Sequence, residues 1–348
     1  MTRLVRAHTP LCEKNIILHV GLPKTASTFL QTRVFAALDQ REICYNPERV
    51  IACIIRSKKR GYSGASLLEL RHCIAEELRQ ISQPRVLLSY EQLCGNPWNG
   101  FSAFQEMTDF LSGLFPQATV ILVLRRQDDW LLSLYKETLA MLHPVPPWRF
   151  FSSGGARGMP NVWHYDFAGM HQHYRATFGA PRVHLLFFEE LKLNPGAFIE
   201  RLLRILGVTR PGITKPGNLE RQVERRGLSA LASLLLLIAL WSPSYLLQRR
   251  LAGKDFAGMP FQRVLRTQPA AAILLCALQR LCTRINATLA LPERLRRGLD
   301  RRAYIDWPLI SRRRRRAILR HYQAGNRQLA PYMPDDAVRA LWLCGPPC

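Results

Sequence analysis

Residues 15–28 read NIILHVGLPKTAST, and this segment gives the clearest indication of the fold. Residues 15–20 form a short apolar run that stops at Gly21, which is typical of a buried strand. After the turn, residues 28–38 carry apolar side chains at the spacing of a helix. The stretch therefore predicts a strand, a tight turn of small residues and a helix, in that order.

Strands and helices continue to alternate as far as residue 207. Further strands are expected at three apolar runs, residues 85–90, 118–124 and 182–188. Helices are expected at residues 67–81, 101–115, 128–141 and 195–206. Such alternation implies parallel strands joined by helical crossovers. We predict an α/β fold of three layers, with a central parallel sheet, a P-loop-like turn that binds an anion, and a helical C-terminal extension.

The chain is strongly basic, and the charge is unevenly spread. Its 49 Lys and Arg exceed its 25 Asp and Glu, which gives a net charge of +24, while 48% hydrophobic residues exclude a disordered protein. Residues 1–207 are predicted to form the α/β core, and residues 208–348 a basic, mostly helical part packed on it. The arginine run 312–316 is interpreted as a solvated face. Because aromatic residues do not alternate with the arginines, sequence-specific binding of nucleic acid is not expected.

Cysteines and apolar segments indicate where the protein works. Nine cysteines without a C-x-x-C pair predict free thiols rather than a zinc site or a disulfide framework. With no signal peptide in the first twenty residues, we expect a cytoplasmic protein. Residues 227–248 are uncharged and contain LASLLLLIALW. We interpret them as a buried or surface-lying helix ended by Pro243, with a membrane-spanning helix as the alternative, so peripheral membrane contact stays open.

Two motifs carry the chemistry. In the first, the turn at Gly21 would direct backbone amides at an anion, Lys24 would add a cation, and the hydroxyls of Ser27 and Thr28 would add donors. The lysine precedes the small residues, so this is not the Walker A pattern. The second motif follows the strand at 118–124.

In this second motif, Arg125 ends the strand and Ser133 follows eight residues later on the next helix. The two could converge on one phosphate, although Arg125 could instead pair with Asp128 or Asp129. Glu189 and Glu190, after the last strand, are interpreted as structural.

Together these motifs resemble those of sulfotransferases that use 3′-phosphoadenosine 5′-phosphosulfate (PAPS). The resemblance implies that Arg125 and Ser133 bind the 3′-phosphate, that Lys24 acts on the bridging oxygen, and that no metal is required. It implies that the 5′-phosphosulfate is held by the turn, namely Gly21, Pro23, Lys24, Thr25, Ala26, Ser27 and Thr28. Weaker similarities lie at residues 86–91, 183–191 and 321–329.

The catalytic base is the main departure from this family. Its cytosolic members place a histidine at the end of the strand that reads VLLSYE here, where this chain has Glu91. Glu91 is our first candidate because a carboxylate at a strand's carboxyl end faces the ligand crevice, and partial burial would raise its pKa above about 4.3. Glu48 and Glu42 are alternatives. His19, on the first strand, is interpreted as a packed core residue.

We therefore expect transfer of a sulfuryl group from PAPS to a hydroxyl or amine of a glycan, lipid or small-molecule acceptor. Residues 143–167 and the region after residue 208 would form the acceptor wall. A P-loop kinase or nucleoside triphosphatase is one alternative. The other is a non-catalytic protein that binds polyanions or membranes. The sequence leaves the acceptor and the oligomeric state open.

Overall fold

The structure is a computed structural model that describes residues 14–60, 64–140, 145–151, 164–208 and 309–344. These residues divide into two compact units. The sheet unit comprises residues 14–126, 164–208 and 321–344, and the second unit comprises residues 127–151 and 309–320, each within the described ranges. The predicted site and the core that supports it lie largely in the sheet unit.

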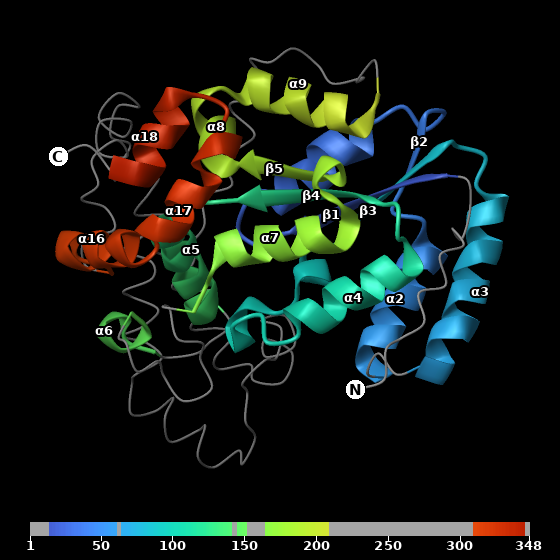
Figure 1. Cartoon of the computed structure of the whole chain (residues 1–348), viewed down its shortest axis with the longest axis horizontal. Helices are drawn as coiled ribbons and strands as arrows, with labels where there is room; N and C mark the ends of the chain where they lie inside the picture. The colour runs from blue at the N-terminus through green and yellow to red at the C-terminus, as the bar shows by residue number, and fades with distance from the viewer. Residues whose placement is uncertain (1–13, 61–63, 141–144, 152–163, 209–308, 345–348) are drawn as a thin grey trace, which may run out of the picture. The chain divides into compact units, whose positions relative to one another are not determined.

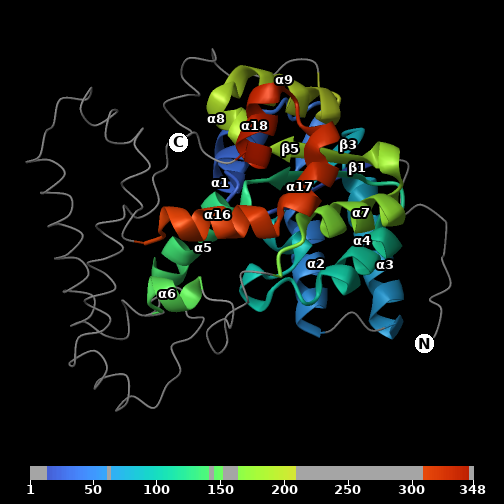
Figure 2. The same cartoon turned by 60° about the vertical axis from the view of Figure 1, so that its left-hand side comes forward.

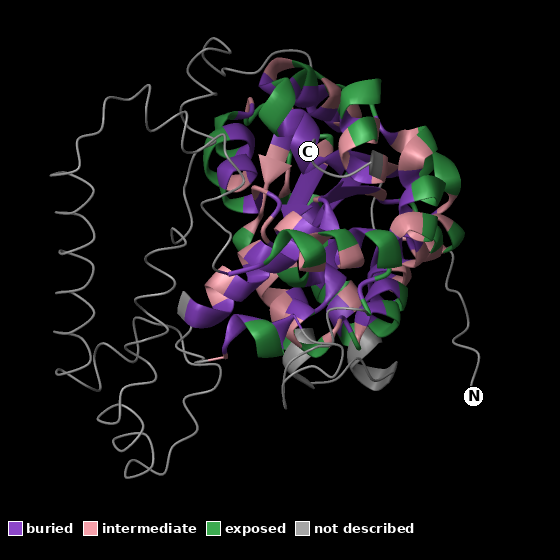
Figure 3. Cartoon of the chain, turned by 90° about the vertical axis from the view of Figure 1, so that its left-hand side faces the viewer, coloured by how far each residue is buried: buried purple, intermediate pink, exposed green. Residues whose placement is uncertain are grey.

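Five parallel strands form the sheet, in the order β2-β3-β1-β4-β5 (Figure 1). They are β1 (Asn15–Gly21), β2 (Ile43–Tyr45), β3 (Arg85–Ser89), β4 (Thr119–Leu124) and β5 (Val183–Phe187). Because β1 is central, the turn that follows it is flanked by the carboxyl ends of β3 and β4. Nearly all residues of the inner strands β1, β3 and β4 are buried, as their colour in Figure 3 shows, so both faces of these strands are covered. This explains why those strands are continuous apolar runs.

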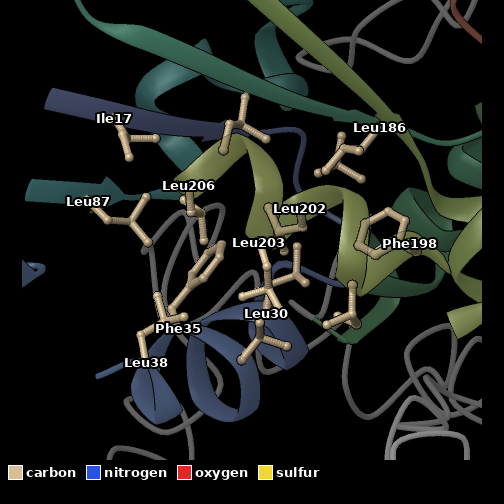
Figure 4. Packing of buried hydrophobic residues seen from close by; sticks show 14 of the residues in the cluster. Ile17, Leu30, Phe35, Leu38, Leu87, Leu186, Phe198, Leu202, Leu203 and Leu206 are labelled. Atoms are coloured by element: carbon tan, nitrogen blue, oxygen red, sulfur yellow. The ribbon is translucent and has the colours of Figure 1, made fainter. Parts of the chain in front are cut away.

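One face of the sheet packs against the helical run that follows the first turn. This run is α1 (Ser27–Phe29), the π-helical η1 (Leu30–Val34) and the 3₁₀ helix η2 (Phe35–Ala37). Figure 4 shows side chains of the run packed with α9 (Pro195–Leu206) and the strands. Asn194 caps α9 by accepting the amide of Ala197 at 3.0 Å, and Gly207 ends it with a φ of +67°. Sequence and structure agree here.

The other face of the sheet is covered by α4 (Phe104–Leu114) and α7 (Phe167–Phe178), below the sheet in Figure 1. Late in the chain, α17 (Gln323–Leu329) lies beside α7, and α18 (Asp336–Cys344) follows it (Figure 2). The remaining helices of the sheet unit are α2 (Glu48–Arg60), α3 (Gly64–Gln80), α8 (Phe188–Leu193), η3 (Glu91–Cys94), η4 (Pro97–Asn99), η5 (Ala180–Arg182) and η6 (Ala330–Tyr332). The predicted three-layer α/β fold is confirmed.

The second unit contains α5 (Gln127–Ala140), α6 (Pro147–Phe150) and most of α16 (Arg312–His321). Arg315 pairs with Asp128 at 2.9 Å and with Asp129 at 2.7 Å, and its side chain is only 12% exposed. The run 312–316 is therefore not solvated throughout, because one of its arginines ties α16 to α5.

The two compact units are each assembled from segments that lie far apart in the sequence. Residues 321–344 group with the sheet, because Trp342 and Tyr322 are buried and bonded there. Residues 127–151 group instead with residues 309–320. The apolar segment 227–248 lies outside the described residues. Among the helices that are described, none has the length and apolar character to cross a membrane.

Candidate functional site

The turn after β1 is curled by three residues in the left-handed region. Gly21 has a φ of +107°, and Lys24 and Ala26 each have a φ of +66°. A Cβ atom on Gly21 would lie 3.1 Å from the carbonyl oxygen of Glu91. Glycine is therefore needed at this position both for its backbone angle and for the close approach of the neighbouring chain.

The hydroxyls of this turn bond within it. Thr25 Oγ1 and Ser27 Oγ donate to the carbonyl oxygen of Leu22 at 2.5 and 3.0 Å, and both residues are buried. The amide of Leu22 in turn donates to the carbonyl of Val123 at 3.1 Å. The hydrogen of the Ser27 hydroxyl therefore points into the turn, toward Leu22. Thr28 is exposed.

The helical run starts with the geometry that favours an anion. The amide of Leu30 donates to the carbonyl of Ala26 at 3.0 Å, which is the first turn of the helix. The amides of Ser27, Thr28 and Phe29 precede this bond, and such leading amides have no carbonyl partner within a helix. They give the end of the turn a partial positive charge.

Arg125, directly after β4, reaches back to the same turn. Its Nη1 donates to the carbonyl oxygen of Lys24 at 3.2 Å, and its guanidinium lies 4.6 Å from the ring centroid of Phe188. Its Nε is buried and has no hydrogen-bond partner among the described residues. The alternative pairing with Asp128 or Asp129 does not occur, since those carboxylates bind Arg315.

The residue after it, Arg126, is anchored from two directions. Its amide donates to Glu189 Oε1 at 3.0 Å, and its Nη1 donates to the carbonyl of Leu341 at 3.1 Å. The second oxygen of Glu189 accepts the indole N–H of Trp342 at 2.9 Å. Glu189, Arg126 and Trp342 are all buried, so this network lies in the protein interior.

The three carboxylates considered as bases lie in different places. Glu91 is half-buried in the first position of η3, and its carbonyl faces Gly21 and accepts the Cys94 thiol at 3.2 Å. The pKa of the adjacent Tyr90 phenol is raised, mainly by burial and to a smaller extent by the negative charge of Glu91. Glu48 is exposed at the start of α2, after β2, whereas Glu42 precedes β2 and so belongs to the opposite edge of the sheet.

His19 lies on β1 beneath the turn and is completely buried. Its Nδ1 is 2.7 Å from Ser89 Oγ, and its ring packs edge-on against Phe35 at 5.3 Å. Burial lowers the pKa of His19 to about 4, so the ring is neutral at physiological pH. The sequence-based interpretation of His19 as a core residue is confirmed.

A model of the sulfotransferase family matches residues 17–211, more than half of the chain. This protein belongs to the sulfotransferase family. The sulfotransferase of Alicyclobacillus acidocaldarius is 16% identical, with 66% of this chain and 96% of that chain covered and a TM-score of 0.42. The sulfotransferase domain of the Curacin biosynthetic pathway is 14% identical, with 63% and 80% covered and a TM-score of 0.36. No curated protein matches this sulfotransferase.

The sulfotransferase brings most of its predicted site residues together at one edge of the sheet. The turn from Gly21 to Thr28 is flanked by Glu91 from β3 and by Arg125 from β4. Ser133 belongs to the second unit, where it lies half-buried on α5. Within the described residues, no group of three or more His, Cys, Asp or Glu is placed to hold a metal ion.

Sequence reasoning missed the network of Glu189 and Trp342. The pattern EEL at residues 189–191 contained the carboxylate, but its partner lies 153 residues further along the chain. No local spacing connects the two residues, so only the folded structure relates them.

Proposed function

We propose that this sulfotransferase transfers a sulfuryl group from PAPS to a hydroxyl or amine of a glycan, lipid or small-molecule acceptor. The main support is the meeting of two motifs from separate strands. Arg125 Nη1 binds the carbonyl of Lys24, while Arg125 Nε is buried without a described partner. Buried polar groups are normally hydrogen-bonded, so a buried N–H donor without a partner is expected to bind a ligand. Because the donor belongs to a guanidinium, an anionic ligand fits it best.

The residues present fit the two anionic ends of PAPS. Lys24 and the leading amides of the helical run, up to Thr28, would hold the 5′-phosphosulfate. Arg125 would hold the 3′-phosphate through its fork, and Ser133 of α5 would add a hydroxyl. Gly21, Pro23 and Ala26 would shape the backbone around the ligand. Thr25 and Ser27 would keep that shape through their bonds to Leu22.

When bound, PAPS would supply the sulfuryl group, and its remainder, 3′,5′-ADP, would leave with the negative charge of the broken bond. Lys24 would stabilise that charge at the bridging oxygen, which is the kind of electrostatic contribution that usually dominates catalysis. Glu91 would accept the proton of the acceptor hydroxyl or amine, since it lies half-buried beside Gly21. Membership of the sulfotransferase family favours this reaction over the kinase and polyanion-binding alternatives.

A thermal-shift titration with 3′,5′-ADP tests the donor assignment. At a hundred times its dissociation constant, the nucleotide should stabilise the protein by about 2.7 kcal/mol. ATP with magnesium serves as the parallel titration. Stabilisation by ATP and none by 3′,5′-ADP would favour a nucleoside triphosphatase and contradict the proposal.

A pair of carboxylate variants tests the base. Glu91→Gln should lower the rate of transfer from labelled PAPS by about a hundredfold, because general-base catalysis contributes on the order of 10² to 10⁴. Glu48→Gln tests the alternative base and should leave the rate nearly unchanged, since Glu48 is exposed at the start of α2. Equal rates for the wild type and Glu91→Gln would remove Glu91 from the mechanism while leaving the donor assignment intact.

A further inference from the structure

We infer that Glu189 is a positioning residue for Arg125 and that Trp342, near the end of the chain, completes this function. The inference rests on the proposed function, in which Arg125 binds the 3′-phosphate of the nucleotide. It assigns to α18 an indirect part in nucleotide binding, through the position of Arg125. From the sequence alone, Glu189 is interpreted as a structural residue and Trp342 has no predicted role.

The first step is the bond between Glu189 and the backbone after Arg125. Glu189 Oε1 accepts the amide of Arg126 at 3.0 Å in a buried environment. That amide belongs to the peptide unit that also contains the Cα atom of Arg125, and peptide units are planar. Holding the amide therefore fixes the direction in which the Arg125 side chain leaves the strand. From there its guanidinium reaches the carbonyl of Lys24.

The second step is the bond between Glu189 and α18. Glu189 Oε2 accepts the indole N–H of Trp342 at 2.9 Å, and the Trp342 ring packs edge-on against Phe187 at 5.3 Å. The carbonyl oxygen of Leu341, also in α18, accepts a hydrogen bond from Arg126 Nη1 at 3.1 Å. Residues 341 and 342 thus contact both the carboxylate and the residue that the carboxylate holds.

Burial makes this arrangement sensitive to the loss of any one partner. Glu189 is 5% exposed and Trp342 is 1% exposed, so a carboxylate oxygen without its donor cannot be solvated well. Glu190, the next residue, offers a comparison within the same helix. It is also buried, but it pairs with Arg201 of α9 at 2.5 Å, away from the turn after β4.

Three single variants, a comparison in the Arg125→Ala background and two nucleotides test the inference. Trp342→Phe keeps the aromatic packing and removes the N–H donor, and Glu189→Gln keeps the size of the side chain and changes its charge. Glu190→Gln is the control for the loss of a buried carboxylate. Calorimetry would give the dissociation constants of 3′,5′-ADP and 5′-AMP for each protein, and circular dichroism would establish that each protein folds.

We expect Trp342→Phe and Glu189→Gln to bind 3′,5′-ADP about tenfold more weakly than the wild type, as coupled neighbours do. Their affinity for 5′-AMP should stay unchanged, because that nucleotide lacks the 3′-phosphate. A general loss of structure would weaken the binding of both nucleotides alike. Glu190→Gln should not alter the ratio of the two dissociation constants. In Arg125→Ala, which removes the guanidinium, adding Trp342→Phe should produce no further loss of 3′,5′-ADP affinity.

The outcomes separate this inference from the proposed function. A wild-type protein that binds neither nucleotide, or does not prefer 3′,5′-ADP, overturns the proposed function. A wild type that prefers 3′,5′-ADP, with a Trp342→Phe variant that keeps the full preference, overturns the positioning role and leaves the function standing. If Glu189→Gln does not fold, Trp342→Phe alone decides between these results.

Discussion

The two turns that meet at the edge of the sheet are held in opposite ways. The turn after β1 is closed by its own residues, since Thr25 and Ser27 both donate to Leu22 within the same loop. The turn after β4 is instead tied to distant segments of the chain. It is held by Glu189, 63 residues from Arg126, and by Leu341, 215 residues from it.

The contrast explains which part of a site can be recognised in a sequence. A self-contained turn must carry its small residues, glycine and hydroxyls close together, so it forms a visible motif. A turn held by distant segments leaves only its central arginine visible. If the turn after β1 is self-contained, single substitutions within it should change activity, stability or nucleotide binding.

Lys24→Ala should lower the rate of sulfuryl transfer by about a hundredfold or more, by analogy with the loss of one oxyanion donor elsewhere. The lysine is the cation of the first turn and, in our proposal, meets the charge that develops on the leaving group. Transfer from labelled PAPS measures the effect. Lys14→Ala is the matched control, because Lys14 lies at the opposite end of β1 and donates to the carbonyl of Gln83. Full activity in Lys24→Ala would defeat the assignment of this turn.

Acid should destabilise the strand beneath the first turn. The pKa of His19 is lowered by burial from 6.5 to about 4, so the unfolded chain binds a proton that the folded chain rejects. Above pH 6.5 this effect does not reduce the free energy of unfolding. As the pH falls from 6.5 toward 4, the free energy of unfolding decreases by about 2 to 3 kcal/mol. Urea unfolding at pH 7 and pH 4.5 would measure it.

The variant His19→Asn removes this titrating group, so its stability should fall less steeply over the same pH range. The matched control is His72→Asn, because His72 is exposed on α3. An identical pH dependence in the wild type and His19→Asn would show that the acid sensitivity arises elsewhere, for example at buried His171, whose pKa burial also lowers.

The sequence predicted the strands β1, β3, β4 and β5 because buried parallel strands are continuous apolar runs. It did not predict β2, since three residues, Ile43–Tyr45, carry no periodic signal. In the candidate site, it indicated Lys24 and Arg125 because each lies in the turn that follows a strand. It missed Trp342, which enters the site only through tertiary contacts. Local patterns thus indicated the residues that we propose to face the ligand but not the residues that hold them in place.

The backbone of the first turn gives the next test. Gly21→Ala should destabilise the protein by about 1 to 2 kcal/mol, because φ is +107° and the new Cβ would lie 3.1 Å from the Glu91 carbonyl. Gly207→Ala is the control, since Gly207 also has a positive φ but only meets the flexible side chain of Arg85. Both variants should unfold more easily in urea, whereas only Gly21→Ala should lose affinity for 3′,5′-ADP. Unchanged affinity in Gly21→Ala would mean that the turn does not shape the nucleotide site.

The smallest effect is expected from the hydroxyls within the turn. Ser27→Ala removes the donor to the Leu22 carbonyl and should lower the free energy of unfolding by about 1 kcal/mol. Thr28→Ala, next along the chain, changes an exposed residue and should alter stability by less than about 0.5 kcal/mol. Urea unfolding of both variants measures the difference. If the two variants were equally stable, the turn after β1 would not be closed by its own residues, and the contrast with the turn after β4 would disappear.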